Sequence, residues 1–497
     1  MASHPQAPAS LKPGAIGFVD ALVIGLAATS PAYSLAAVIG PIVVLVGVYA
    51  PGVLIASFVP MLLIASAFLF LNKVDQDCGT TFSWVTRAMG PWFGWVGGWA
   101  ITMTGVLVIG SLADVGVSFT LRMFGLDAAA DNAWVRMPLA IVLILVMTAV
   151  CVLGTDISAR LQNFLILAQV VSLLVFAAVA LIRAVSGDSS LDSITPSLSW
   201  LNPFGEGGSA LTGGLLLGVF AYWGWESAVN LTEETSDSES APGRAGLWST
   251  VILLITYVAV AYAIVAYAGT QWLSDNADLE EAVFAEIASE VMGPWAWVVL
   301  LSVATSAVAS TQTTIIPASR TGLSMARRAA LPKRLAHIHP RFRTPDVSTW
   351  TVAGIAIVWY LVVSTISENA LFDSLTALSL LIAFYYALTG IACAVYYRRH
   401  LTDSAKNLLL IGIGPVVGAL LLIWLLIRSV VDMSDPANSY SGQAWFGVGP
   451  PLVIGIGIAV LGVVVMFLWR LHDARFWRER AGVVDPSLVA PDGDVRR

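Results

Sequence analysis

The sequence predicts an all-α membrane protein of twelve transmembrane helices, built as a five-plus-five inverted repeat in which helices 1 and 6 are discontinuous. Three observations lead to this fold class. Of the 497 residues, 57% are hydrophobic and only 11% are charged. Apolar stretches of about 18 residues or more recur along the whole chain, which is typical of membrane spans. Two of these stretches, in matching positions, are interrupted near their middle.

The apolar stretches define the predicted spans and the domain organisation. In chain order the spans are 17–47, 51–72, 92–124, 135–154, 159–183, 209–235, 246–271, 292–326, 348–367, 371–397, 407–431 and 447–470. Repeat one covers about 16–185, repeat two about 208–400, and two extra helices about 405–471, all within a transporter-like membrane domain, 16–471. Segments 1–15 and 472–497 are expected to be cytoplasmic. Because five spans per repeat is an odd number, the second repeat must insert upside down.

The basic residues predict the orientation in the cell membrane. With both termini in the cytoplasm, only Arg122, Arg136, Arg183 and Arg428 of the 25 Lys and Arg residues fall in outer segments. Positive charge near helix ends is retained on the cytoplasmic side, so this orientation is strongly favoured. The net charge of −7 says little about partners, because the acidic residues are spread over both faces. No polybasic tract is present, so no nucleic-acid partner is expected, and the lipid bilayer is the partner that the apolar spans predict.

The first interruption lies in GLAATSPAYS, where Pro31 removes a backbone donor and Gly25 loosens the preceding turn. A discontinuous helix exposes amide groups at the start of its second half and carbonyls at the end of its first half. These groups suit an anion and a cation, respectively. The predicted substrate-binding residues here are Ala28, Thr29, Ser30, Pro31, Ala32 and Tyr33.

The second interruption, FAYWGWES, places a glycine and a carboxylate at mid-depth of the sixth span, where both are costly unless they serve a buried site. The predicted binding residues here are Tyr222, Trp223, Gly224, Trp225 and Glu226. Glu226 has three alternative roles: bonding the unwound backbone, contacting a substrate amine, or carrying a proton. The tryptophans either line a cavity or form an interfacial belt. Two broken helices in matching positions predict a transporter.

Ion coupling has several candidate residues. All five histidines fall outside the predicted spans, so a buried histidine relay is not expected, and a proton would travel on carboxylates such as Glu226 or Asp114. Asp114 has the alternative of lying solvated at the outer mouth. A sodium ion needs several oxygen ligands, which Ser306 and Ser310 in the eighth span provide, although such hydroxyls also hold helices together.

No enzymatic constellation is expected. The three cysteines offer no disulfide or metal framework. Neither HExxH nor GxSxG occurs in a span, so an intramembrane enzyme is disfavoured. No cofactor is predicted, and paired broken helices disfavour a channel or a receptor.

Four segments together resemble the amino acid, polyamine and organocation (APC) superfamily of secondary transporters. They are GLAATSPAYS, DCGTTFSWVTRAMGPWFGWVGGW, FAYWGWESAVNLTEET with the paired acids Glu233 and Glu234, and the SRxxxxMAR…LP…HP…TP pattern that begins at Ser319. The resemblance implies a five-plus-five inverted repeat, a central site between spans 1, 3, 6 and 8, and alternating access. It also implies that an amino acid α-carboxylate binds at the first break and the α-amine at the second.

Two departures from the family pattern bear on this expectation. Many relatives have a glycine-rich GxG-like first break, whereas this chain has ATSPAYS, which alters the carboxylate pocket. Some proton-coupled relatives place a lysine in span 5 where, aligning on Asn163, this chain has Gln169, which carries no proton. Proton coupling through such a lysine is therefore not expected. The prediction is an amino acid transporter that is proton-coupled through another group or works by exchange, and sodium symport stays open. The alternative is transport of a polyamine or other organic amine, with Glu226 and the aromatic cluster as a cation box.

Overall fold

A computed structural model describes residues 16–154, 159–276, 282–366, 370–439 and 441–478, together with Leu11 and Gly14. The rest of the predicted segment 1–15, and the predicted tail beyond residue 478, lie outside the described residues. Within the described ranges the chain forms helices joined by turns and two isolated β-bridges, and it contains no β-sheet. The all-α prediction is therefore confirmed for these residues.

The longer helices account for most of the described chain. They are α1 (Phe18–Thr29), α2 (Pro31–Val46), α3 (Ala50–Val74), α4 (Thr81–Met89), α5 (Pro91–Met123), α7 (Ala133–Leu153), α8 (Ala159–Ser186), α9 (Gly208–Ala221), α11 (Ala241–Asp275), α12 (Ala282–Met292), α13 (Ala296–Arg327), α14 (Asp346–Ile366), α15 (Ala370–Tyr396), α17 (Gly414–Asp432) and α18 (Pro450–His472). The short elements that matter here are α6 (Asp127–Ala130), α10 (Ser227–Asn230), η3 (Thr232–Glu234), α16 (Ala405–Asn407) and η9 (Phe476–Arg478).

Most of these helices have the length and composition of membrane spans. Among the described residues, ten helical stretches are long and apolar enough to cross a bilayer. One of them, Phe18–Val74, contains α1, α2 and α3, so the first two predicted spans fall within a single stretch. The helix α9 is apolar but shorter, because the predicted sixth span is interrupted. These helices indicate a multi-pass membrane protein.

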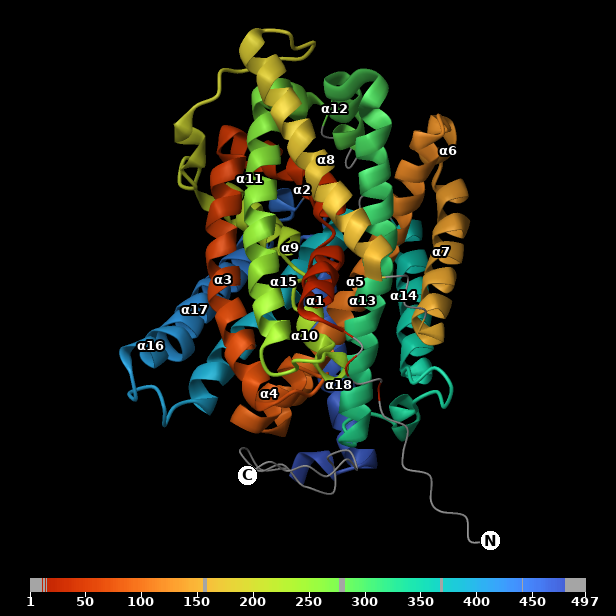
Figure 1. The fold of residues 1–497 in the computed structure, drawn as a ribbon, viewed down its shortest axis with the longest axis vertical. Helices are drawn as coiled ribbons and strands as arrows, with labels where there is room; N and C mark the ends of the chain where they lie inside the picture. The colour runs from red at the N-terminus through yellow and green to blue at the C-terminus, as the bar shows by residue number, and fades with distance from the viewer. Residues whose placement is uncertain are drawn as a thin grey trace.

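The helices α5 and α13 pack along each other at the centre of the bundle, and α7 and α17 lie at opposite edges (Figure 1). Small residues permit the central contact. A Cβ atom at Gly105 of α5 would lie 3.0 Å from Cβ of Ala318 on α13, and one at Gly98 would lie 2.8 Å from Sδ of Met325. Close helix approach at glycine is a common solution in membranes, where no hydrophobic force drives helices together.

Both predicted discontinuous helices are broken. The first break separates α1 from α2 at Ser30, and the second separates α9 from α10 over residues 222–226. In Figure 1, α1, α9 and α10 lie inside the bundle, α12 lies near its upper end and α4 near its lower end. The breaks therefore lie between the two ends of the molecule.

Candidate functional site

The first break consists of one residue in the left-handed conformation. Ser30 has φ 56° and ψ 66°, and α2 begins directly after it with Pro31. The Ser30 amide still donates to the Leu26 carbonyl at 3.0 Å, and the Ser34 hydroxyl donates to the Thr29 carbonyl at 2.7 Å. Proline suits the first position of α2 because that position needs no amide donor. The break is sharp, and these local hydrogen bonds satisfy part of its backbone.

Two hydroxyls of α13 hold the first break from the side. Ser306 Oγ lies 2.8 Å from Ser30 Oγ, and Ser310 Oγ donates to the Ala28 carbonyl at 2.9 Å. On α2, the Tyr33 hydroxyl lies 2.9 Å from Ser111 Oγ of α5. The predicted binding segment Ala28 to Tyr33, which includes Thr29 and the fully buried Ala32, is therefore brought between α5 and α13.

The second break is longer and needs glycine. Gly224 has φ 115°, a conformation that L side chains rarely adopt. A Cβ atom at this position would lie 2.7 Å from the Ala28 carbonyl oxygen and 2.9 Å from the Thr29 nitrogen. The two breaks therefore touch, backbone against backbone, and a side chain at residue 224 would push them apart.

The carboxyl group of Glu226, in the second break, accepts hydrogen bonds from three donors. The hydroxyl of Tyr385 donates to Oε1, the hydroxyl of Tyr386 donates to Oε2 at 2.5 Å, and the Gly224 amide donates to Oε2 at 3.1 Å. Both oxygens are engaged, so Glu226 ties the unwound backbone to α15.

The aromatic residues of the second break point in different directions. Trp223 donates from Nε1 to the Tyr385 hydroxyl at 2.5 Å, whereas Trp225 packs edge-on against Phe68 with ring centroids 5.0 Å apart. Tyr222 packs against Tyr257 with centroids 5.2 Å apart. The Tyr257 hydroxyl in turn donates to the Ala221 carbonyl at the end of α9, at 2.8 Å.

A cavity borders the second break and extends between α5 and α13. Its lining residues are Ile101, Gly105, Trp223, Gly224, Glu226, Ser227, Asn230, Thr314, Pro317 and Ala318. Three of the five binding residues predicted in the second break thus line a cavity. The residues Tyr222 and Trp225 are buried in side-chain packing instead.

Sequence reasoning missed the tyrosines that hold Glu226. Tyr385 and Tyr386 are adjacent on α15, in the segment LIAFYYALTG, which reads as an ordinary apolar span. The one signal available was the pair of hydroxyls in the middle of that span, because buried tyrosine hydroxyls need partners. Nothing in the spacing indicated that the partner is a carboxylate 160 positions earlier.

The two further candidates for ion coupling lie apart from Glu226. Asp114 on α5 accepts a hydrogen bond from the Tyr360 hydroxyl at 2.6 Å and pairs with Arg136, whose Nε lies 3.1 Å away. Gln169 on α8 is 2% exposed and donates to Thr305 Oγ1 at 3.4 Å, while its Oε1 has no partner. Asp114 is thus engaged in an ion pair, and Gln169 faces the same helix, α13, as the first break.

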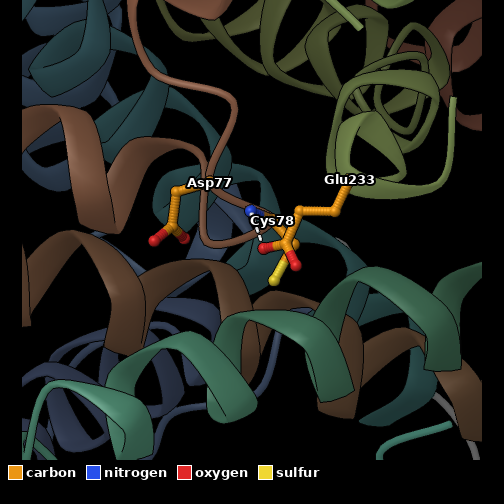
Figure 2. A group of neighbouring side chains, drawn as sticks. All are labelled: Asp77, Cys78 and Glu233. Atoms are coloured by element: carbon orange, nitrogen blue, oxygen red, sulfur yellow. Dashed lines mark hydrogen bonds between the residues drawn. The ribbon is translucent and has the colours of Figure 1, made fainter. Parts of the chain in front are cut away.

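A group of three potential metal ligands lies near the lower end of the bundle. Asp77, Cys78 and Glu233 each offer one ligand atom, and these atoms lie within 4.8 Å of one another (Figure 2). However, Arg327 donates to both oxygens of Glu233 at 3.1 Å, and Ser324 donates to Asp77 Oδ1 at 2.6 Å. A guanidinium on the carboxylate competes with a cation, so this donor set does not suit a metal.

The broken helices, their mutual contact and the adjoining cavity are typical of a secondary membrane transporter. The sequence model of the family described as "Amino acid permease" matches residues 16–467, nearly the whole chain. The chain belongs to this amino acid permease family of the APC superfamily, as the sequence resemblance predicted.

Individual relatives agree with this assignment. An uncharacterized transporter of Mycobacterium tuberculosis is 26% identical over 90% of this chain and 90% of its own length. The branched-chain amino acid permease BcaP of Lactococcus lactis subsp. cremoris is 24% identical over 82% of this chain and 86% of its own length. Among solved structures, a mutant of the manganese transporter of Eremococcus coleocola superposes with a TM-score of 0.51 at 15% identity, covering 92% of this chain and 95% of that chain. That structure shows a shared fold.

Proposed function

We propose that this protein is a secondary active transporter that moves an amino acid across the cytoplasmic membrane by alternating access. One observation carries the proposal: in a member of the amino acid permease family, two helix breaks meet at Ala28 and Gly224, and Gly224 lines a small cavity. Discontinuous helices at mid-depth provide amides for an anion and carbonyls for a cation. An amino acid carries both charges.

The substrate binds, in this proposal, across the two breaks. The α-carboxylate lies at the start of α2, near Ser30 to Ala32, where the positive end of the helix dipole favours an anion without an arginine. The α-amine lies against the carbonyls exposed at the second break. Trp223 and Glu226, which line the cavity, are the side chains nearest to the part of the substrate that lies beyond the amine.

The architecture proposed for this activity has twelve spans, an inverted repeat and both termini in the cytoplasm. Helices in equivalent places of the two repeats pack against each other, α3 with α11 and α5 with α13, as expected for a two-fold relation. Each predicted span contains a helix or a pair of broken helices. The distribution of Lys and Arg supports the orientation.

For energy coupling we propose a proton or exchange, with sodium as the second candidate. Glu226 is the candidate proton carrier that borders the cavity, whereas Asp114 is paired with Arg136. A group of oxygen atoms near the first break supports sodium as a candidate ion. Ser306 and Ser310 of α13 contact the Ala28 to Ser30 segment. On the neighbouring helix α8, the Oε1 atom of Gln169 is buried without a hydrogen-bond partner. Carbonyl and hydroxyl oxygens are the ligands that hard cations prefer.

Transport of a polyamine or other organic amine is the alternative. It needs Glu226 as a free carboxylate facing the substrate. Both of its oxygens already accept hydrogen bonds from Tyr385, Tyr386 and Gly224. This arrangement favours the amino acid, since the carboxylate has little capacity left for an external ammonium group.

Reconstitution in proteoliposomes tests the function. A thermal-shift panel of amino acids and amines on the purified protein selects a ligand, whose uptake is then measured under imposed proton or sodium gradients. We expect saturable, concentrative amino acid uptake that ornithine inhibits and putrescine does not, because only ornithine has an α-carboxylate. Stabilisation and inhibition by putrescine, with no effect of any amino acid, would instead establish the amine transporter.

A further inference from the structure

Two acidic residues just after α10 pair with two arginines of α13. Arg320 donates from Nε and Nη2 to Glu234 Oε1 at 2.8 and 2.5 Å. Arg327 donates from Nη1 to both oxygens of Glu233 at 3.1 Å. The acids lie in η3 and the arginines lie two turns apart on one helix. The pairs therefore fasten the chain that follows the second break to the central helix α13.

The two pairs differ in burial. The Arg320 and Glu234 side chains are 8% and 14% exposed, whereas those of Arg327 and Glu233 are 22% and 24% exposed. Breaking a buried pair by removing one partner leaves an uncompensated charge and is far more disruptive than breaking an exposed pair. Arg320–Glu234 is accordingly the stronger fastening.

The loop between α3 and α4 is a third member of the same layer. The Cys78 amide donates to Glu233 Oε1 at 3.0 Å, and Ser324 of α13 donates to Asp77 at 2.6 Å. From α10, Asn230 donates through Nδ2 to the Cys78 carbonyl at 3.1 Å. Figure 2 shows Cys78 and Glu233 meeting from separate segments beside a helix. Three segments distant in sequence thus converge on a few charged groups.

This layer lies between the cavity and the end of the bundle that carries α4. Asn230 lines the cavity and also contacts the α3–α4 loop. The pairs of Glu233 and Glu234 come directly after it along the chain. Glu233 and Glu234 therefore connect the chain that follows the cavity-lining Asn230 to α13, beside the α3–α4 loop.

We propose that Glu233 and Glu234, with Arg327 and Arg320, form a two-pair electrostatic latch that must break for the cavity to open toward α4, and that Cys78 becomes accessible to thiol reagents only when it does. The proposal rests on alternating access as the proposed function. In this proposal the latch biases a two-state element, because opening separates the paired groups.

Cys78 is a natural reporter of this opening, so no cysteine has to be introduced. It is fully buried and its thiol points to the Arg320 carbonyl, with Sγ 3.6 Å from the oxygen. Burial, and secondarily the charge of Glu233, raises the pKa of Cys78 well above its usual value. Since the thiolate is the reactive form, alkylation in the closed state is slow.

The test measures the rate at which N-ethylmaleimide alkylates Cys78 in the full-length protein in detergent, by mass spectrometry. Cys151→Ser and Cys393→Ser remove the other two thiols. We expect Arg320→Gln to raise the rate about tenfold and Arg327→Gln about threefold, following their burial. Arg320→Lys, which keeps the charge, should stay close to the parent. Arg475→Gln is the matched control, because it removes an ion pair with Asp473 elsewhere, where the Arg475 side chain is 53% exposed.

Each outcome decides the proposal. Unchanged rates in folded Arg320→Gln and Arg327→Gln would overturn it, as would an equal increase in the Arg475→Gln control. If Arg320→Gln does not fold, the substitution of the less buried Arg327, Arg327→Gln, decides alone. The readout needs no transported substrate, so faster alkylation in a protein that takes up no amino acid would leave the latch standing while the proposed function fails.

Discussion

The two helix breaks touch each other, but they are held by different chemistry. The first, at Ser30, is one residue long, and neutral hydroxyls of Ser306 and Ser310 brace it. The second, over residues 222–226, contains a glycine with φ 115° and is fastened by a buried carboxylate to two tyrosines. Losing a buried carboxyl group with three donors leaves more unsatisfied partners than losing a hydroxyl with one. The second break should therefore tolerate substitution far less than the first.

Gly224→Leu should have the largest effect, because it attacks the point where the breaks meet. The side chain would be strained at this φ and its Cβ would lie 2.7 Å from the Ala28 carbonyl oxygen. We expect loss of uptake in proteoliposomes and a decrease of roughly 3 kcal/mol in the free energy of unfolding. Gly354→Leu is the control, since nothing lies within 4 Å of a Cβ there. Retained substrate binding in Gly224→Leu would show that the site lies elsewhere.

Glu226→Gln should have the second-largest effect on uptake. The amide replaces an acceptor oxygen by a donor, so at least one tyrosine hydroxyl loses its partner in a buried site. We expect uptake to fall by at least about tenfold, with stability lowered by about 2 kcal/mol. Glu206→Gln, at an exposed loop position, is the control. Unchanged uptake kinetics with lowered stability would make Glu226 a structural brace only.

Tyr386→Phe should have a smaller effect on uptake than Glu226→Gln. Comparing it with Tyr397→Phe distinguishes an effect on stability from an effect on transport. It removes one donor to Glu226, whereas Tyr397→Phe removes a bond of 2.7 Å to the Phe70 carbonyl, far from the breaks. Each should lower stability by about 0.6 to 1.5 kcal/mol, the range for buried hydrogen bonds in membranes and in water. Only Tyr386→Phe should reduce the maximal uptake rate. Equal uptake in both variants would mean that the tyrosine does not act through Glu226.

Ser310→Ala should have the smallest effect, since it removes one neutral bond to the Ala28 carbonyl. We expect a loss of about 0.6 kcal/mol in stability. Ser379→Ala is matched, because Ser379 bonds only within its own helix, to the Leu375 carbonyl. If sodium drives uptake, Ser310→Ala should also raise the sodium concentration that gives half-maximal uptake. No such shift, in a sodium-driven protein, would remove Ser310 from the ion site.

The places where the helices break could be predicted because their causes are local. Pro31 and Gly224 are visible in the sequence, and an apolar run that contains them cannot continue as a regular helix without compensation. The helices themselves follow from the length of the apolar runs. The same local signals identified three residues that line the cavity: Trp223, Gly224 and Glu226.

The partners of the breaks could not be predicted, because they depend on how distant helices are rotated. Tyr385 and Tyr386 lie about 160 positions from Glu226 and carry no signal that assigns them to it. The same limit affected the aromatic residues of the second break. Trp223 and Trp225 are two positions apart, yet one lines the cavity and the other packs against Phe68. In an unwound segment no helical period tells which way a side chain points.

The adjacent pair Tyr385 and Tyr386 sets an angular constraint on α15. Successive side chains on an α-helix diverge by about 100°, so two neighbours reach a single carboxylate only if it lies near the bisector between them. A small rotation of α15 about its own axis would bring one hydroxyl closer to Glu226 and draw the other away. These two hydrogen bonds therefore fix the rotation of α15 about its own axis relative to the second break. The helix can tilt or move together with that break, but it cannot rotate relative to it.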